Sequence, residues 1–424
     1  MRYQSQKHSA KYTGDYVFSQ LIPYIGNKRK LLPLIGQAIA RTGLKPENST
    51  FLDCFSGSGV VSRYAKQLGF AVIANDWEPY AEVISLCYTV LNHAPTFDGS
   101  LSYTEIIDQL NHCKPEAGWI TDHLCPADDV EYDIKHDRMF YMRKNGMRLD
   151  AIREQIEKWD REGKLNKLQK SALLGPLIYQ ACWLSNTSGV FKGFHNGWGG
   201  QTATALYRIC ADLFLEPALF LDNKRSNQAF RMNASDLVVS LENDVDFAYL
   251  DPPYNQHPYG SNYHVLNTLV LWDRPDLPSK ITHHGNKSAI RRDWRTERRS
   301  AYNDKTKAAS EYSRILGALR SKWICTSYST DGFIPLEQMM AVNCKHGEVS
   351  VFVQEYKRYR VSSQRFSEKP MNVEFVVLID TSKQSTRSPE SYTNQILKAE
   401  ATAIASHIET PTSDQPQMEI FNGQ

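Results

Sequence analysis

A strand, a glycine turn and a helix in direct succession limit what this chain can fold into. Residues 51–55 form an apolar run, Ser-Gly-Ser-Gly follows at 56–59, and residues 60–68 have the composition of a helix. Gly57 and Gly59 allow a nucleotide-like ligand to approach the backbone closely, and the helix N-terminus beyond them is electropositive. The segment predicts an α/β sheet that binds a nucleotide cofactor.

A second strand at 70–74 ends at Asn75-Asp76. Asp76 therefore follows the glycines by about 20 residues, where an acid can bind ribose hydroxyls. Only two glycines of the dinucleotide fingerprint are present, and the turn is preceded by an acid, Asp53, before Phe55. An acid there suits a cationic sulfonium better than an anionic pyrophosphate. The loop favours S-adenosylmethionine over NAD.

Residues 249–254 read Tyr-Leu-Asp-Pro-Pro-Tyr at the end of an apolar strand. An exocyclic amino nitrogen such as adenine N6 is a poor nucleophile, and gripping both of its N–H bonds takes two acceptors. Asp251 supplies one, and the Pro252 carbonyl, made rigid by Pro252 and Pro253, supplies the other. Tyr254 can stack on a base extruded from a duplex. The motif predicts methylation of an amino nitrogen, although taken alone it is also found in ordinary Pro-Pro turns.

These motifs, in this order, resemble the Dam-like, alpha-group DNA adenine-N6 methyltransferases. Near the N-terminus, Tyr24, Gly26 and Lys28 match the family's Tyr-x-Gly-x-Lys pattern. Asp236 is similar to the acid that contacts the cofactor's adenine, and residues 323–332 and 351–360 resemble two late strands. The resemblance covers most of residues 20 to 380.

The resemblance implies a class I, Rossmann-like methyltransferase fold: a mostly parallel seven-stranded sheet with an inserted, largely helical target-recognition domain. S-adenosylmethionine would be the cofactor, with no metal. The residues implied to bind it are Tyr24, Gly26, Lys28, Asp53, Phe55, Gly57, Gly59, Asp76, Asp236 and Asp251. The catalytic residues implied are Asp251, Pro252, Pro253 and Tyr254.

The same reading divides the chain into four parts. Residues 1–91 and 231–380 form the catalytic domain, 92–230 the recognition insertion, and 381–424 a flexible tail. Within the insertion, residues 136–185 look helical, and the loop at 186–200 offers Lys192, His195 and Asn196 as DNA contacts. A structural hairpin would also explain that loop.

Two segments after the tetrapeptide are further candidates for DNA contact. The loop at 255–264 carries Tyr259, Asn262 and Tyr263, which suit a loop that orders around a flipped base, and a solvent loop is the alternative. Between Lys280 and Lys322 there are twelve Lys or Arg residues and four acids, whereas the whole chain has a net charge of only +2. A basic insertion at about 280–310 would contact phosphates, and its candidates are Lys287, Arg291, Arg292, Arg295, Arg298 and Arg299. The alternative is a charged surface that is simply exposed to solvent.

Several classes of protein are disfavoured by composition. The eight cysteines form no Cys-x-x-Cys pair and are expected to be reduced. His112, Cys113, His123 and Cys125 match no standard zinc spacing. No apolar run approaches the roughly 18 residues of a membrane span. We expect a soluble, cytoplasmic, nucleoid-associated prokaryotic protein.

The resemblance thus predicts sequence-specific methyl transfer to N6 of a flipped adenine in duplex DNA, in a restriction-modification or epigenetic system, with a cognate restriction endonuclease as a candidate partner. A second candidate partner is a bacterial sliding clamp, whose docking peptides resemble Gln417, Met418, Ile420 and Phe421. Cytosine-N4 and RNA adenine methylation remain alternatives, as does a non-catalytic DNA-binding module. Protein-glutamine methylation is less favoured, because it usually has Asn at position 251.

Overall fold

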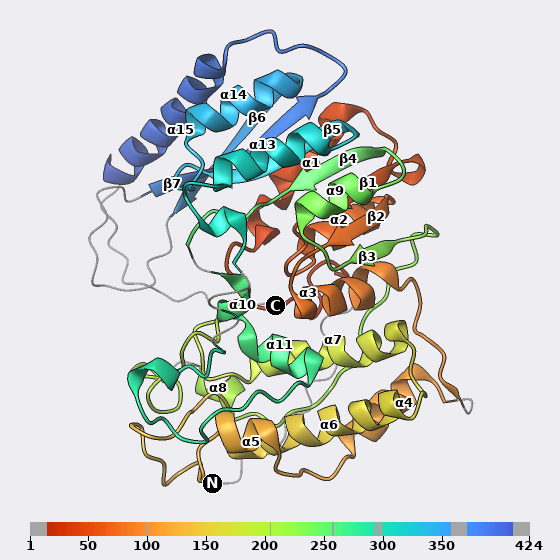
Figure 1. Ribbon diagram of the computed structural model, residues 1–424, viewed down its shortest axis with the longest axis vertical. Coiled ribbons are helices and arrows are strands. Elements are labelled where there is room, and N and C mark those ends of the chain that lie inside the picture. The colour runs from red at the N-terminus through yellow and green to blue at the C-terminus, as the bar shows by residue number, and fades with distance from the viewer. Residues whose placement is uncertain are drawn as a thin grey trace.

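The computed structural model describes residues 15–98, 101–203, 205–256, 258–291, 294, 299–357 and 371–409. Seven strands form one sheet in the order β3-β2-β1-β4-β5-β7-β6 (Figure 1). β7 runs antiparallel to β5 and β6, and the other neighbours are parallel. The expected fold is confirmed. The strands are β1 (Thr50–Asp53), β2 (Ala71–Asn75), β3 (Gln228–Phe230), β4 (Val245–Leu250), β5 (Ser321–Ser329), β6 (Glu348–Lys357) and β7 (Met371–Asp380).

Helices cover both faces of the sheet, so most side chains of the central strands β1 and β4 are apolar and buried. Phe51 of β1 packs in one core with α1 (Leu32–Thr42) and α2 (Val60–Leu68). Its neighbour Leu52 packs in the other core, on the opposite face of the sheet. Successive side chains of a strand alternate between faces, so a strand buried on both sides needs an unbroken apolar run. The second face carries α9 (Ala234–Ser240), α13 (Ala308–Ala318) and α14 (Leu336–His346).

The C-terminal segment differs from the flexible tail expected from composition. Residues 389–409 form helix α15 (Pro389–Glu409), which packs with α14 and β7. Tyr392 and Ile396 are buried in the sheet core, and Glu400 accepts a hydrogen bond from Thr330 (2.6 Å). These three side chains recur every four residues and so share one helical face, which an average over a polar stretch conceals. The clamp-like residues 417–421 lie outside the described residues.

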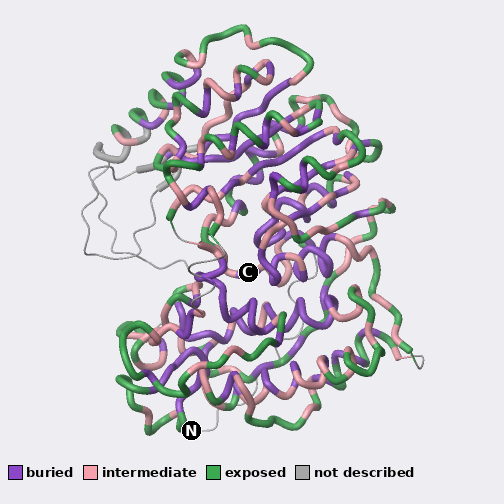
Figure 2. The backbone as a smooth tube through the Cα atoms, in the orientation of Figure 1, coloured by how far each residue is buried: buried purple, intermediate pink, exposed green. Residues whose placement is uncertain are grey.

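The insertion forms a second, helical body below the sheet in Figure 1. Figure 2 shows that it has its own buried interior. The two longest helices of the insertion, α6 and α7, lie in the region expected to be helical, and α7 contains Pro176. The elements after β2 are α3 (Pro79–Ile84), the π-helical turn η3 (Ser85–Val90), α4 (Tyr103–Asn111), α5 (Trp119–Leu124), α6 (Arg143–Arg161), α7 (Lys167–Trp183) and α8 (Leu206–Ile209).

Two helices that follow the Asp-Pro-Pro-Tyr segment belong to this helical body. In Figure 1, α10 (Tyr259–Asn262) lies between the sheet and the helical body, and α11 (His264–Leu271) lies beside α7 in that body. Leu266 and Leu269 of α11 pack in the core formed by α3 and α7, not against the sheet. The chain that leaves the end of β4 therefore passes directly into the insertion's core.

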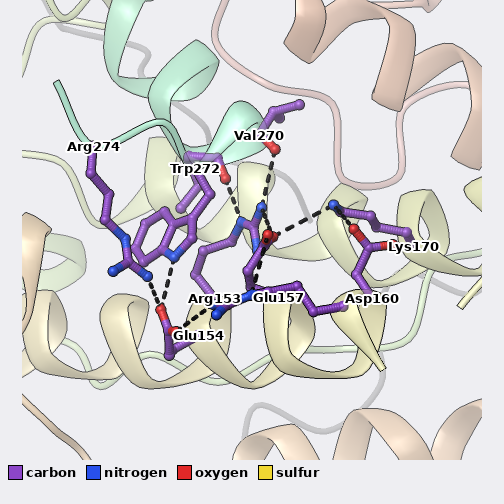
Figure 3. A network of polar contacts seen from close by, with 10 residues as sticks. Arg153, Glu154, Glu157, Asp160, Lys170, Val270, Trp272 and Arg274 are labelled. Atoms are coloured by element: carbon purple, nitrogen blue, oxygen red, sulfur yellow. Dashed lines mark hydrogen bonds and ion pairs between the residues drawn. The ribbon is translucent and has the colours of Figure 1, made fainter. Parts of the chain in front are cut away.

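A buried polar network fixes the end of α11 to α6 (Figure 3). The Arg153 side chain is fully buried, and it donates to the carbonyls of Leu269 (2.7 Å) and Val270 (3.2 Å). Those carbonyls lie in the last turn of α11, where intrahelical partners run out and a cation is favoured. Arg153 also pairs with Glu157 at 2.9 Å. α11 is thus held by the insertion at its C-terminus.

The insertion begins and ends at one place. Asn92 donates to the Arg225 carbonyl (2.9 Å), and Asn227 donates to the Asn92 side chain (3.1 Å). Asn227 also accepts from the backbone N–H of Val72 in β2 (3.0 Å). Both ends of the insertion are therefore fastened to each other and to the sheet.

Within the described ranges, none of the helices is both long and apolar enough to cross a membrane. The same residues contain no group of three or more His, Cys, Asp or Glu side chains that could hold a metal ion.

Candidate active site

The two main motifs of the sequence, the glycine turn and the tetrapeptide, meet at the switch point of the sheet. β1 and β4 are adjacent and parallel, but the chain proceeds from β1 towards β2 on one side and from β4 towards β5 on the other. Ligands of open α/β sheets bind where the strand order reverses, beyond the carboxyl ends of the strands. Asp53 ends β1 opposite Tyr249, and Asp251 follows β4 directly.

Asp251 is fixed from two sides. The Lys28 ammonium lies 2.9 Å from one carboxylate oxygen, and the Ser327 hydroxyl donates to the other at 3.1 Å. Burial raises the pKa of Asp251, and Lys28 and Ser327 oppose that shift by stabilising the charged form. Burial alone would lower the pKa of Lys28, but Asp251, Tyr254 and Glu374 together outweigh this effect and the pKa is raised. The pair is therefore a buried ion pair that orients Asp251.

Tyr254 is held beside this pair. Its ring lies edge-on to Tyr328 (centroids 6.2 Å apart), and the Lys28 ammonium is 5.8 Å from its centroid. Its backbone carbonyl accepts from the N–H of Phe333 (3.2 Å). Residues 323–332, which contain Tyr328, thus support the Asp-Pro-Pro-Tyr segment.

The glycine turn is braced by the two motifs on either side of it. Gly57 and Gly59 have left-handed backbones, with φ of 50° and 78°. The N–H of Gly57 donates to Asp76 (2.8 Å), so the acid at the end of β2 fixes the turn. A Cβ on Gly57 would lie 2.8 Å from the Tyr24 ring. Only glycine allows Tyr24 to pack so closely on the turn.

Asp53 is a buried acid with an open acceptor. One carboxylate oxygen accepts from Ser62 (2.6 Å), whereas the other has no hydrogen-bond partner among the described residues. Burial raises the pKa of Asp53 to about 7. A buried carboxylate with an unfilled acceptor beside the glycine turn fits a cationic ligand.

A cavity opens above these strand ends. Its walls come from the glycine turn, residues 75–78 after β2, residues 232–234 after β3, the tetrapeptide, and residues 300–303. The proposed cofactor residues that line it are Tyr24, Phe55, Gly57, Asp76 and Asp251. Gly26, Lys28, Asp53 and Gly59 are not among the residues that line the cavity. Asp236 is exposed in the first turn of α9 and does not line the cavity; Asn233 and Ala234 occupy that wall instead.

Asn75 is a structural residue of the site that the sequence did not single out. It is buried, and its amide donates to the carbonyls of Cys54 and Met232, both at 3.1 Å. Its side-chain oxygen accepts from the N–H of Met232 (3.1 Å). Asn75 therefore ties the ends of β1, β2 and the segment after β3 together. The only sequence signal was its position next to Asp76.

The aromatic residues after the tetrapeptide are packed on the N-terminal motif. Tyr24 stacks on Tyr263 and Tyr259, with centroids 4.9 Å and 5.2 Å away. The Tyr263 hydroxyl accepts from the N–H of Ile25 (2.8 Å), and Tyr263 and Asn262 are both buried. These two residues have no face open to DNA, so we do not retain them as DNA contacts. Tyr259 lines the cavity.

The candidate DNA surface brings the insertion loop and the basic segment together. The Lys287 ammonium donates to the exposed Asn196 side chain (3.0 Å) and lies over the Phe194 ring. Lys192 and Arg299 are exposed. His195 and Arg291 are half-buried, and Arg291 pairs with Asp273. Arg292, Arg295 and Arg298 lie outside the described residues.

The first part of the basic segment is anchored to the insertion. Arg138, buried in the helical body, donates to the carbonyls of Pro278 (2.7 Å) and Asn286 (3.0 Å). The N–H of Ile281 donates to the His136 carbonyl (2.7 Å). The basic segment and the insertion therefore present one surface, although the chain separates them by the whole of β4.

The sheet order, with its antiparallel seventh strand and a cavity at the β1/β4 switch point, defines a class I methyltransferase. A comparison with family models is more specific. Residues 24–315 match the model for the D12 class N6 adenine-specific DNA methyltransferases, and the chain belongs to this family.

Similar proteins include modification methylases. The chain is 27% identical to modification methylase LlaI of Lactococcus lactis subsp. lactis over 379 residues, covering 87% of this chain and 56% of that protein. It is 29% identical over 338 residues to the type II methyltransferase M.NlaIII of Neisseria lactamica (80% and 92%). It is 25% identical over 346 residues to M.FokI of Planomicrobium okeanokoites (82% and 50%). The chain thus spans about half the length of LlaI and M.FokI and nearly all of M.NlaIII.

Proposed function

We propose that this chain transfers a methyl group from S-adenosylmethionine to N6 of an adenine extruded from duplex DNA. The observation that carries the proposal is the position of Asp251, which lies at the switch point, lines the cavity and is fixed by Lys28 and Ser327. Family membership supports adenine as the target base.

The residues of the chain orient the base. Asp251 accepts one N6–H, and the Pro252 carbonyl accepts the other, so that the nitrogen lone pair faces the donor. Lys28 and Ser327 restrict the carboxylate to one orientation, and Tyr254 stacks on the base. Orientation of this kind contributes most of the rate, because the donor's sulfonium already carries an activated methyl group.

The cavity suits this donor. Gly57 and Gly59 leave the backbone open to close approach, and Asp76 lies at the wall where a ribose binds. The open acceptor of Asp53 provides negative charge near a cationic sulfur or ammonium group. Tyr24 packs against the turn and lines the cavity beside it.

The helical insertion is proposed as the target-recognition domain. Its loop residues Lys192, His195 and Asn196 would act together with the basic residues after α11, namely Lys287, Arg291, Arg292, Arg295, Arg298 and Arg299. Their proximity through the Lys287–Asn196 bond supports one continuous contact surface. The names of the relatives support a role as the modification enzyme of a restriction-modification system with a cognate endonuclease.

The decisive experiment incubates the protein with S-adenosylmethionine and unmethylated genomic DNA, and maps N6-methyladenine by single-molecule sequencing. We expect one modified sequence motif. Asp251→Ala should abolish transfer but retain cofactor binding. Asp244→Ala, at the exposed opposite end of β4, is the matched control and should keep both.

Other outcomes have distinct meanings. Cofactor binding without adenine methylation would favour cytosine N4 or RNA as the target. An active Asp251→Ala variant would overturn the assigned role of the carboxylate. Absence of cofactor binding in the intact chain would favour a non-catalytic DNA-binding protein.

A further inference from the structure

One wall of the cavity comes from the end of the segment that the sequence assigns to DNA contact. Tyr302 and Asn303 lie in the short 3-10 turn η6 (Ala301–Asn303), and both line the cavity with Ser300. The Asn303 amide donates to the Asn255 carbonyl (2.8 Å), directly after the tetrapeptide. The wall is therefore fastened to the loop that carries Asp251.

Tyr302 carries a buried hydroxyl that the described residues leave without a partner. Its side chain is 3% exposed, and its hydroxyl has no hydrogen-bond partner among the described residues. Buried hydroxyls in proteins are almost always hydrogen-bonded. At the wall of a binding cavity, the missing partner is best supplied by a bound ligand.

The position of Tyr302 indicates which part of the ligand it meets. Its ring lies edge-on to Phe55, with centroids 5.6 Å apart and planes at 89°. Phe55, Ala234 and Glu311 line the same cavity, and the Ser235 hydroxyl donates to Glu311, which joins the segment after β3 to α13. If Asp76 at the end of β2 binds the ribose, as proposed above, the walls after β3 and at η6 remain for the purine of an adenosine ligand.

We propose that the Tyr302 hydroxyl forms a hydrogen bond with the adenine ring of the bound cofactor, so that η6 is part of the cofactor site. This inference rests on the proposed S-adenosylmethionine binding. Phe55 and Tyr302 form two sides of the purine subsite. The Tyr302 hydroxyl either donates to a ring nitrogen or accepts from the amino group. Residues 300–303, which lie between the candidate DNA-contact residues and α13, then also form a wall of the cofactor site.

The test is binding of two ligands to the full-length protein by isothermal titration calorimetry. Both S-adenosylhomocysteine and 5′-methylthioadenosine contain adenosine, but only the first has the amino-acid portion. Tyr302→Phe removes only the hydroxyl and should weaken both ligands equally, by about three- to tenfold, the range for one hydrogen bond. DNA affinity should not change.

Tyr141→Phe is the matched control. Tyr141 is also a buried tyrosine without a hydroxyl partner among the described residues, but it lies in the helical body beside Phe191. This variant should bind both ligands like the wild type. The ligand-free Tyr302→Phe protein should melt no lower than wild type, while its ligand-induced rise in Tm is smaller.

Equal ligand affinity in Tyr302→Phe and wild type would overturn the inference. So would weakened binding of S-adenosylhomocysteine alone, because the contact would then be to the amino-acid portion. Failure of the wild type to bind S-adenosylhomocysteine would refute the proposed cofactor itself, a result distinguishable from either of these.

Discussion

Replacement of Lys28 by Met should convert a buried ion pair into a buried, uncompensated carboxylate. The Lys28 side chain is 6% exposed and that of Asp251 18%, so water replaces little of the lost interaction. Among the described residues, the Ser327 hydroxyl is the group that would still stabilise the charge on Asp251. Breaking one partner of a buried pair costs about 3–5 kcal/mol.

The variant relieves part of this cost by protonating Asp251. Because protonation removes the uncompensated charge, the loss of Lys28 should raise the pKa of Asp251 further. A carboxyl whose pKa is higher in the folded than in the unfolded state destabilises the fold as pH rises. The stability deficit of Lys28→Met should therefore be largest above the raised pKa and shrink as pH falls below it.

Urea denaturation of the ligand-free protein between pH 5 and pH 8 measures this deficit. Lys28→Met/Asp251→Asn, which removes both charges, should be more stable near neutral pH than Lys28→Met alone. Lys30→Met, an exposed lysine of the same turn, is the control and should change little. A deficit independent of pH, together with a double variant no more stable than the single one, would refute the coupling between Lys28 and Asp251.

Three further predictions concern the supports of the site. Gly57→Ala should weaken S-adenosylhomocysteine binding at least tenfold by calorimetry, because the new Cβ meets the Tyr24 ring; unchanged affinity would contradict the packing argument. Ser327→Ala removes a hydrogen bond worth about 1 kcal/mol, so kcat should fall about fivefold and the acid limb of the pH–rate profile should move to higher pH; an unmoved limb would show that the hydroxyl does not tune Asp251. Arg153→Leu should destabilise the fold by about 3–5 kcal/mol and speed hydrogen exchange in α11, whereas exposed Arg161→Leu should do neither.

Local features explain the parts of the site that the sequence predicted. The glycine turn and the strand before Asp251 can be recognised in the sequence, because their residue types are compatible with only a few backbone conformations. Once β1 and β4 are recognised as parallel neighbours, the meeting of Asp251 with the glycine turn follows from topology alone. The mostly parallel seven-stranded sheet was predicted from the resemblance to the DNA adenine-N6 methyltransferases.

Contacts between distant segments account for what the sequence did not reveal. Tyr263 resembles a loop aromatic available to a base, but its ring is covered by Tyr24, 239 residues earlier in the chain. Asp236 lies in a recognisable segment, yet the helix directs it outward while Asn233 and Ala234 face the cavity. The sequence did not reveal α15, because three buried positions on one helical face, Tyr392, Ile396 and Glu400, do not change the polar average composition of the segment.

The bonds that join Asn92, Arg225 and Asn227 bear on how such an enzyme acquires a new specificity. An inserted segment whose two ends are joined by hydrogen bonds can be exchanged without disrupting the sheet. The entropic cost of bringing the two ends together is offset by bonds that lie outside the exchanged residues. Arg153 adds a condition, since it caps α11 from within the excursion. A chimera that replaces residues 93–224 should retain its fold and cofactor site only if the segment from α10 to Arg291 comes from the same donor protein.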